Sequence, residues 1–509
     1  MGAFCKGSGY IRSPYKLYLV RCAHGGYNHP MRDSADAHKY EQVAADVTHL
    51  VESGTFRPGD RLPSVRHLSR QKAVSISTVL QAYYLLEARG LIEARPRSGF
   101  YVCTHLPTAL PEPDISSPEP DPTEVSVREL VTRVVLVDTH NPGLVQLGAA
   151  HPNPALTATR KLNRILSSIA RRMGDESGSY DYVPGCEGLR VQIARRAVAA
   201  GCSLAPGDVV ITSGCTESVS LCLRAVCRPG DTVAIESPIC FDALQSLEVM
   251  GLRALEIPTH PRDGISLDAL RFAIEHNTVS ACLVISNFNN PLGSCIPGDN
   301  KRELVRLLAR HTIPLIENDI FGEIYFDDQR PTVAKAYDRT GLVMLCSSFS
   351  KSLCPGYRVG WVVPGRFREK IEWLKYTSSL ASPTLSEYAI AEFMAGGGYD
   401  PYLRRIRRTY ARHVASMSQA VRRFFPKGTR LTRPAGGFVL WVQLPDSVDS
   451  LELYGRALAA GIAITPGYLF SAAEQYRNFV RLNAANWSDE AERAVERLGA
   501  LIVGQKPGF

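Results

Sequence analysis

The sequence predicts an α/β protein in two parts: a small N-terminal domain of helices with one short hairpin, and a large C-terminal domain with a mostly parallel sheet. Three observations predict this fold class. The chain has 509 residues, too many for one ordinary domain. Residues 107–122, PTALPEPDISSPEPDP, hold six prolines and can sustain neither a helix nor a sheet ladder. Beyond them, short apolar runs alternate with helical stretches, which is typical of α/β architecture.

The composition is that of a soluble protein, with 45% hydrophobic and 21% charged residues. No apolar run approaches the roughly 20 residues that a membrane span needs, so we expect no membrane partner. The thirteen cysteines show no C-x-x-C spacing, and several lie in apolar runs, as Cys222 and Cys282 do. We therefore expect no metal site, and core cysteines in a reducing cytoplasm.

Residues 1–36 receive no fold assignment. Residues 1–30 show no sustained helical or strand period and lack the features of a targeting signal. They contain Tyr, Leu and Val, which a solvating tail avoids. We expect translation to start at Met31. The alternative is a basic arm that contacts DNA phosphates, because these 30 residues hold four Lys/Arg and no acid.

Residues 37–103 predict three helices and a hairpin. The first helix begins near His38, and Gly54 ends it; the second covers residues 64–71; after a tight turn at Ala73, the third covers residues 75–90. Residues 91–102 read as two short strands around a basic tip at residues 95–99. The expected core residues are Val43, Val47, Leu50, Val51, Val79, Ala82, Tyr83, Leu85 and Leu86.

This order of elements predicts a winged helix-turn-helix that binds double-stranded DNA. The charge agrees: residues 61–103 hold seven Lys/Arg against two Asp/Glu, although a solvated basic face alone would be common. The wording RPGDRLPSVRHLS, VSISTVLQAYYLLEARGLI and ARPRSGFYV resembles the GntR family of bacterial regulators. The resemblance implies DNA contacts from Arg66, Ser75, Ser77, Thr78, Arg95 and Arg97.

One residue departs from that family. Ile76 stands early in the recognition helix, where family members often carry Arg or a polar residue. It either contacts a thymine methyl group or packs against the domain. Residues 104–126 hold five acids and no Lys/Arg, and we interpret them as a semi-extended acidic linker that ends the domain.

Residues 127–507 form the large domain. Its expected strands lie within residues 208–214, 232–237, 281–286, 314–319 and 343–350, and a smaller α+β subdomain begins near Pro401. The central motif is SSFSKSLCPGYRVGW, residues 347–361, which resembles fold type I pyridoxal-phosphate (PLP) enzymes, the aspartate aminotransferase class. That chemistry needs a lysine amine for the PLP aldehyde and cations for its phosphate. The resemblance makes Lys351 the Schiff-base residue and assigns the phosphate to Ser348 and Arg358.

Five further segments resemble that class and follow the order that it uses; one of them is the Gly-rich PAGGFVLWV, residues 434–442. Residues 213–218 open a helix whose backbone at Gly214, Cys215 and Thr216 would cradle phosphate. Asn290, in SNFNNPLG, would bond the PLP ring hydroxyl, and Tyr180 would reach the phosphate of the partner subunit. Arg481, in FVRLNAAN, would bind an α-carboxylate as a bidentate pair.

The surroundings of the expected PLP ring depart from the class. The aspartate that pairs with the ring nitrogen is replaced by Asn318, and the tyrosine three residues later by Phe321. The adjacent Asp319 is a candidate to substitute as a cofactor-binding residue, although successive strand residues point to opposite faces. An aromatic ring-stacking residue is replaced by Cys240, with Phe241 beside it. These changes weaken the ring as an electron sink and favour sensing over fast transamination.

The two halves together resemble the MocR subfamily of GntR regulators, along essentially the whole chain from residue 37. The resemblance implies a head-to-tail, domain-swapped homodimer that binds PLP, senses PLP or an amino compound, and recognises a DNA operator. One alternative is a working aminotransferase with an appended DNA-binding domain. Another is a repressor whose large domain only dimerises, which an intact Lys351 disfavours.

Overall fold

The computed structural model describes residues 35–504, except 54, 58, 89–90, 96–97, 104–108, 137–140 and 142. The described residues form two compact units that divide near residue 105. Met31, Arg97 and Gly54 lie outside the described residues, as does nearly all of the unassigned N-terminal segment. In the part of the chain that is described, no helix is long and apolar enough to cross a membrane.

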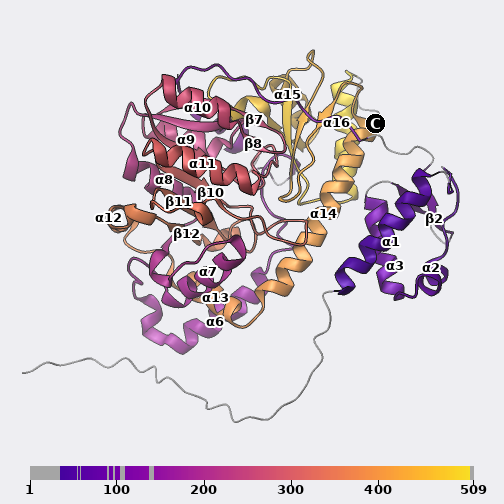
Figure 1. Cartoon of the computed structure of the whole chain (residues 1–509), viewed down its shortest axis with the longest axis horizontal. Helices are drawn as coiled ribbons and strands as arrows, with labels where there is room; N and C mark the ends of the chain where they lie inside the picture. Colours follow the sequence, from indigo (N-terminus) through magenta and orange to yellow (C-terminus); the bar gives the residue numbers. More distant parts are fainter. Residues whose placement is uncertain are drawn as a thin grey trace, which may run out of the picture. The chain divides into compact units, whose positions relative to one another are not determined.

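The small unit is a three-helix domain with a hairpin (Figure 1). Its elements are α1 (Ala35–Glu52), α2 (Val65–Gln71), α3 (Ile76–Ala88), β1 (Ile92–Arg95) and β2 (Gly99–Val102). The two strands pair antiparallel, with Ile92 opposite Val102. The order of elements is the predicted one, and the short turn between α2 and α3 passes through Ala73, whose φ is 51°.

The core of this unit combines one face from each helix with Leu62 and the hairpin residues Ile92 and Val102. It includes all but two of the apolar residues that we predicted for it. Leu50 and Leu85 are only partly buried. On α1, Ala44 is fully buried, although we did not predict it as a core residue. Serines begin the second and third helices, since Ser64 Oγ accepts from His67 N (3.3 Å) and Ser75 Oγ from Thr78 N (3.1 Å).

The large unit is built on one central sheet. Its strand order is β3-β7-β6-β9-β10-β11-β12-β5, with β8 paired to β7. The inner strands β7, β6, β9, β10 and β11 run parallel, whereas β3, β8 and β12 run antiparallel to their neighbours. The strands are β3 (Thr123–Glu124), β5 (Val210–Thr212), β6 (Thr232–Ser237), β7 (Arg253–His260), β8 (Gly264–Ile265), β9 (Val279–Val284), β10 (Leu315–Asn318), β11 (Val343–Ser348) and β12 (Gly360–Val363).

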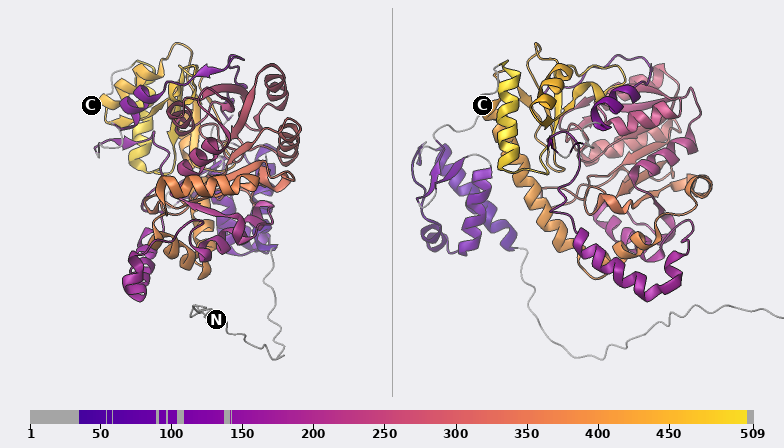
Figure 2. Two further views of the ribbon diagram at one scale, coloured as in Figure 1. Left: turned by 90° about the vertical axis from the view of Figure 1, so that its left-hand side faces the viewer. Right: turned by 180° about the vertical axis from the view of Figure 1, so that it is seen from behind.

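Helices cover both faces of this sheet (Figures 1 and 2). Alternate residues of β6 are buried on opposite faces of the sheet: Val233 and Ile235 belong to one hydrophobic core, and Ala234 belongs to another. The α/β prediction is therefore confirmed. The helices are α4 (Arg128–Val131), α6 (Thr159–Met173), α7 (Glu187–Ala197), α8 (Cys215–Val226), α9 (Phe241–Val249), α10 (Leu267–His276), α11 (Gly298–Arg310), α12 (Arg368–Ser379) and α13 (Thr384–Ala395).

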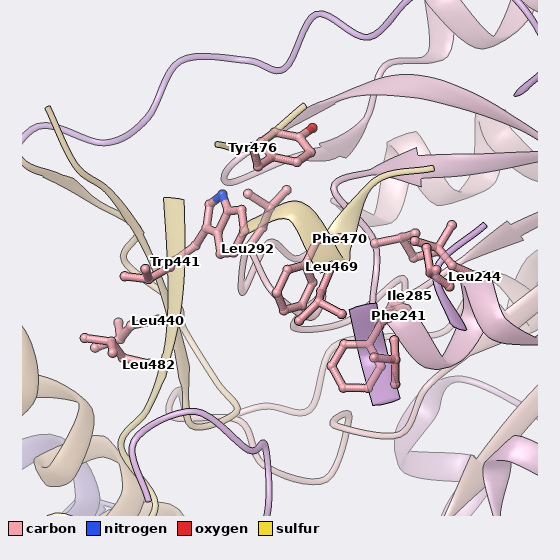
Figure 3. Close-up of a cluster of buried hydrophobic side chains, with 14 of the residues drawn as sticks. Phe241, Leu244, Ile285, Leu292, Leu440, Trp441, Leu469, Phe470, Tyr476 and Leu482 are labelled. Carbon is pink, nitrogen blue, oxygen red and sulfur yellow. The ribbon is translucent and has the colours of Figure 1, made fainter. Parts of the chain in front are cut away.

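A smaller α+β subdomain follows, as predicted, and the long helix α14 (Tyr399–Phe424) leads into it. Its sheet has the order β13-β14-β17-β16, and a short parallel pair joins β15 to β4. Trp441 and Phe470 of this subdomain pack in one cluster with Phe241 of α9 (Figure 3). The elements are β4 (Val145–Gln146), β13 (Arg430–Leu431), β14 (Val439–Gln443), β15 (Ile462–Ala463), β16 (Thr465–Pro466), β17 (Phe479–Asn483), α15 (Ser450–Ala459) and α16 (Asp489–Ile502).

The acidic linker has no helix, as its prolines predict, but from residue 109 on it lies against the large unit. Strand β3 pairs with β7 through Thr123 and Glu124. Pro113 is buried, and linker acids pair with arginines of the large unit. Residues 109–124 of the predicted linker are therefore extended and docked on the large unit rather than free in solvent.

Candidate functional site

A single cavity gathers most of the residues that the sequence singles out in the large domain. It lies beside the carboxyl ends of the parallel strands, where open α/β sheets bind ligands. Nine of the predicted site residues line it: Lys351, Cys215, Thr216, Cys240, Phe241, Asn290, Asn318, Phe321 and Arg481. They come from six separate chain segments, which the fold brings to one place.

Lys351 follows β11 and faces this cavity. Its Nζ donates a hydrogen bond to the carbonyl oxygen of Ala150 at 2.7 Å. Burial lowers the pKa of Lys351, while the carboxylate of Asp242 opposes that shift. A lowered pKa increases the fraction of neutral amine, which is the form that attacks a carbonyl.

Arg481 on β17 is buried in the same cavity with neutral partners. It donates to Gly148 O (2.9 and 3.2 Å), to Asn290 Oδ1 (3.1 Å) and to Thr465 Oγ1 (3.3 Å). Among the described residues, no carboxylate lies within ion-pair distance of its guanidinium. A buried cation without a counter-ion fits a ligand carboxylate.

Asn290 connects Arg481 to the segment that would face a cofactor ring. Its Oδ1 accepts from Arg481, and its Nδ2 donates to Cys240 Sγ at 3.3 Å. Burial raises the pKa of Cys240 to about 12, so this thiol stays protonated at neutral pH. Phe241 lies beside it, with the Arg481 guanidinium 5.5 Å from its ring centroid.

The start of α8 forms a cradle at one end of the site. Gly214 precedes the helix with φ of 98°, and a side chain there would meet Arg358 Nη2 at 2.6 Å. Arg358 itself has φ of 53° and donates to Ser213 O at 2.9 Å. Helix N–H groups beside an exposed guanidinium fit a phosphate dianion. Arg358 and Gly214 adjoin the cavity-lining residues Cys215 and Thr216 rather than line the cavity themselves.

Ser348 ends β11 and is buried; its Oγ accepts from Ser350 N at 3.2 Å. Tyr180 is 65% exposed and lies outside the cavity of its own chain. A residue that reaches a partner subunit would be exposed in this way.

Asn318 ends β10 and lines the cavity. Its Oδ1 accepts from Ile320 N (3.1 Å) and from the Cys215 thiol (3.3 Å). Because both neighbours are donors, the amide oxygen is held by them and the amide nitrogen is the group left for a ligand. Phe321 also lines the cavity, and it has no hydroxyl to offer there.

Asp319 lies outside the cavity, so its prediction as a cofactor residue needs correction. Its carboxylate is buried, forms an ion pair with Arg330 and accepts from Asn287 Nδ2 at 2.7 Å. The alternation of side chains along β10 turns it away from Asn318. It cannot replace the missing ring-nitrogen carboxylate.

Two cavity residues, His151 and Asp242, were not predicted from the sequence. Burial, with help from the charges of Lys351 and Arg481, lowers the pKa of His151, which favours the neutral imidazole. Asp242 lies in the first turn of α9, two residues after Cys240. The sequence could have indicated Asp242 only through its position directly after the ring-facing segment. His151 lies in a loop, and no motif indicates it.

In the small unit, three of the predicted DNA-contacting residues, Ser75, Ser77 and Thr78, lie at the start of α3, whereas Arg66 lies on α2. Ser75, Ser77 and Arg66 are exposed, and Thr78 is half-buried. The hydroxyl of Ser75 hydrogen-bonds to the hydroxyls of both Ser77 and Thr78, each at 2.7 Å. Ile76 is 53% exposed, which removes the alternative that it packs against the domain.

Arg95 on the hairpin is partly engaged, since it pairs with Glu93 at 2.7 Å and lies over the Tyr101 ring at 4.3 Å. Arg61, which the sequence did not indicate, forms a β-bridge with Tyr101 and lies beside Gly99 of the hairpin. It adds an exposed cation to this end of the domain. Its place in a turn segment gave no sequence signal.

Comparison with known proteins matches both units. Residues 39–102 match the family of bacterial regulatory proteins called gntR, and residues 148–498 match aminotransferase class I and II. Two HTH-type transcriptional regulators of Escherichia coli match nearly end to end. YjiR is 38% identical over 466 residues, which are 91% of this chain and 98% of YjiR; YdcR is 38% identical over 467 residues, 91% and 99%. The chain belongs to the MocR subfamily of GntR regulators.

Solved aminotransferases resemble the large unit of this MocR regulator. The α-aminoadipate aminotransferase LysN of Thermus thermophilus, complexed with N-(5′-phosphopyridoxyl)-L-leucine, is 28% identical with a TM-score of 0.68, over 72% of this chain and 94% of LysN. The kynurenine aminotransferase of Pyrococcus horikoshii is also 28% identical, with a TM-score of 0.67, over 74% and 94%. The predicted family, fold class and regulator function are confirmed. Homologues with the aminotransferase fold depend on PLP, and the phosphopyridoxyl ligand of LysN is an example.

Proposed function

We propose that this MocR regulator binds PLP in the described cavity and changes its DNA binding in response to PLP or to an amino compound. Lys351 supplies the amine that bonds the cofactor, and its lowered pKa supports that role. The α8 cradle with Arg358 and Ser348 takes the phosphate, and Asn290 takes the ring hydroxyl. Arg481 takes the α-carboxylate of an amino compound.

PLP would supply an aldehyde that reversibly bonds primary amines and a ring that withdraws electrons from them. The protein's residues set how strongly the ring does so. Asn318 presents an amide donor, which bonds an unprotonated ring nitrogen and does not hold a proton there as a carboxylate would. Binding of the amino compound is thereby retained while proton abstraction from it is slow.

One observation carries the proposal: Lys351 and Arg481 share a cavity in which Asn318 stands where a ring-nitrogen carboxylate is expected. A dedicated aminotransferase needs that carboxylate, whereas a sensor needs only the binding groups. Family membership adds the DNA-binding unit. We further propose a head-to-tail, domain-swapped homodimer in which Tyr180 reaches the partner's phosphate site, and a cytoplasmic location where the operator is accessible.

Titration of the purified full-length protein with PLP tests the cofactor assignment. We expect visible absorbance from PLP bonded to the protein, and we expect Lys351→Ala to lose it. Lys335→Ala is a matched control, because Lys335 pairs with Asp338 outside the cavity. Equal absorbance from wild type and Lys351→Ala would overturn the assignment.

The second candidate is an active aminotransferase with an appended DNA-binding domain. It is favoured by the buried Arg481, which suits a substrate carboxylate as well as an effector carboxylate. Single-turnover reaction with amino acids separates the two. A working enzyme would approach the median turnover of roughly 10 per second.

A further inference from the structure

The acidic linker contacts both subdomains of the large unit. Residues 109–118, here called the docked segment, run along one edge of that unit (Figure 1). On the C-terminal subdomain, Leu431 N donates to Pro111 O at 2.9 Å and Arg433 Nη2 donates to Leu110 O at 2.7 Å. On the central sheet, Ser116 N donates to Thr259 O at 3.3 Å.

Glu112 joins the two subdomains through one carboxylate. Its side chain is only 13% exposed and pairs with Arg262, in the turn between β7 and β8. Its Oε1 also accepts from Arg433 N at 3.2 Å, just after β13. Because both partners hold one carboxylate, a change in the distance between them breaks one of the two bonds. The pair of Arg430 with Asp114 is far more exposed and contributes little.

Ser116 lies at the carboxyl ends of β6 and β7. Its Oγ donates to Ser237 O at 2.6 Å and accepts from Thr259 N at 2.7 Å. One linker hydroxyl therefore bonds the backbone of two neighbouring parallel strands. Ser237 is the last residue of β6 and is completely buried.

The chain runs directly from Ser237 into the wall of the cavity. Ile239, Cys240, Phe241 and Asp242 all line that cavity, and we call residues 237–242 the cavity loop. The loop is bonded on its other side to the C-terminal subdomain: Ser237 Oγ lies 2.7 Å from the Tyr476 hydroxyl, and Ile239 N donates to Phe470 O at 3.0 Å. Figure 3 shows Phe241, Phe470 and Tyr476 around this junction.

We propose that Ser116 and Glu112 are positioning residues, through which docking of the linker and filling of the cavity are coupled. The inference rests on the proposed function, because the cavity loop is the part that would face the cofactor ring. Coupling between two binding events is reciprocal: if docking strengthens PLP binding, PLP strengthens docking by the same factor. Neither residue touches the cavity, so both act through the loop and the subdomain contact.

The coupling has a direct consequence for the DNA-binding unit. Release of the docked segment would add ten residues to the chain that connects the two units, or about 34 Å at roughly 3.4 Å per extended residue. A longer connection lowers the effective concentration of one DNA-binding unit near its half-site when the other is bound. Ligand binding would thus regulate DNA affinity through the length of free linker.

Ser116→Ala in the full-length protein tests the positioning role. We expect PLP to bind about threefold to tenfold more weakly than to wild type, since one bonded hydroxyl is lost. Ser117→Ala is the matched control, because Ser117 is the next residue and is exposed. Equal PLP affinities for Ser116→Ala, Ser117→Ala and wild type would overturn the inference while leaving the proposed function intact. Failure of wild type to bind PLP would instead defeat the proposed function.

Hydrogen exchange tests the reciprocal direction. We expect peptides from residues 109–118 to exchange more slowly when PLP is added to wild type, and we expect this protection to shrink in Glu112→Gln. Glu119→Gln is the control, since Glu119 is an exposed acid of the same linker. Exchange that PLP leaves unchanged in wild type would contradict the coupling. If PLP protects residues 109–118 from exchange equally in Glu112→Gln, Glu119→Gln and wild type, Glu112 has no part in the coupling.

Discussion

At the scale of single residues, the cavity has the groups that an aminotransferase uses to bind its cofactor and substrate. It lacks the carboxylate that would keep the ring nitrogen of the cofactor protonated. Lys351 and Arg481 are present and share one cavity, while Asn318 offers an amide to the ring nitrogen. The neighbouring acid, Asp319, is committed to a buried ion pair with Arg330. Asp319 is therefore not available to take the place of the missing ring-nitrogen carboxylate.

Asn318→Asp should raise the rate of transamination. A carboxylate stabilises a protonated ring nitrogen, which makes PLP a stronger electron sink. We expect wild-type turnover well below roughly 10 per second and a gain of tenfold or more in the variant, measured by single-turnover absorbance. Asn277→Asp makes the same charge change at the end of α10, and a similar gain there would contradict the account.

Asp242→Asn should shift the pH dependence of PLP binding to lower pH. The Asp242 carboxylate raises the pKa of Lys351 against the lowering effect of burial. Without that negative charge the pKa falls further, and neutral amine appears at lower pH. The measurement is PLP affinity by absorbance across neutral and mildly alkaline pH. Asp242→Glu keeps the charge and should follow wild type; an upward or absent shift in Asp242→Asn would refute the electrostatic role.

Residue types and their order let the sequence predict most of the site, because the motifs around Lys351, Asn290 and Arg481 need particular chemistry. The sequence did not indicate His151 or Asp242, because their proximity to Lys351 depends on how distant segments fold together. It also left the role of Asp319 open. Strand alternation gave the correct direction, but only the structure shows Arg330 as its partner.

At the scale of elements, one short helix start combines stability with recognition. Ser75 caps α3 by accepting from Thr78 N, whereas Ser77 lies inside the first turn and is exposed. We therefore propose different roles for the two serines: Ser75 caps the helix, and Ser77 contacts DNA. The sequence placed both in the recognition helix, but the capping bond could be assigned only from the fold.

Ser75→Ala and Ser77→Ala should separate those jobs. Loss of the cap should destabilise α3 by about 1 kcal/mol and speed its hydrogen exchange. Ser77→Ala should leave exchange unchanged and weaken DNA binding across sequences, because a hydroxyl–phosphate contact carries no base information. DNA affinity would be measured by fluorescence anisotropy. Equal hydrogen exchange in the two variants would refute the capping assignment.

The linker shows where composition misleads at this scale. Six prolines and an excess of acids predict a semi-extended linker and give no sign of what it contacts. Residues 109–124 are extended, yet they dock, because their acids meet arginines that lie far away in the sequence, such as Arg262 and Arg430. Such partners are invisible until the fold is known.

At the scale of the whole molecule, the chain joins a GntR-type DNA-binding unit to an aminotransferase-like unit. The fold class was predictable, because the hydrophobic periods and the proline-rich break are strong signals. The regulatory claim requires more than the presence of both units. It requires that events in the cavity change the affinity for DNA.

The direct test compares DNA affinity of full-length wild type and Lys351→Ala, each with and without PLP. The DNA would be a fragment selected from a random library by wild type, labelled for fluorescence anisotropy. We predict that PLP changes the affinity of wild type by about fivefold or more, within the usual range of allosteric coupling, and leaves Lys351→Ala unchanged. Wild-type affinity that is the same with and without PLP, and with amino acids added, would contradict the central claim.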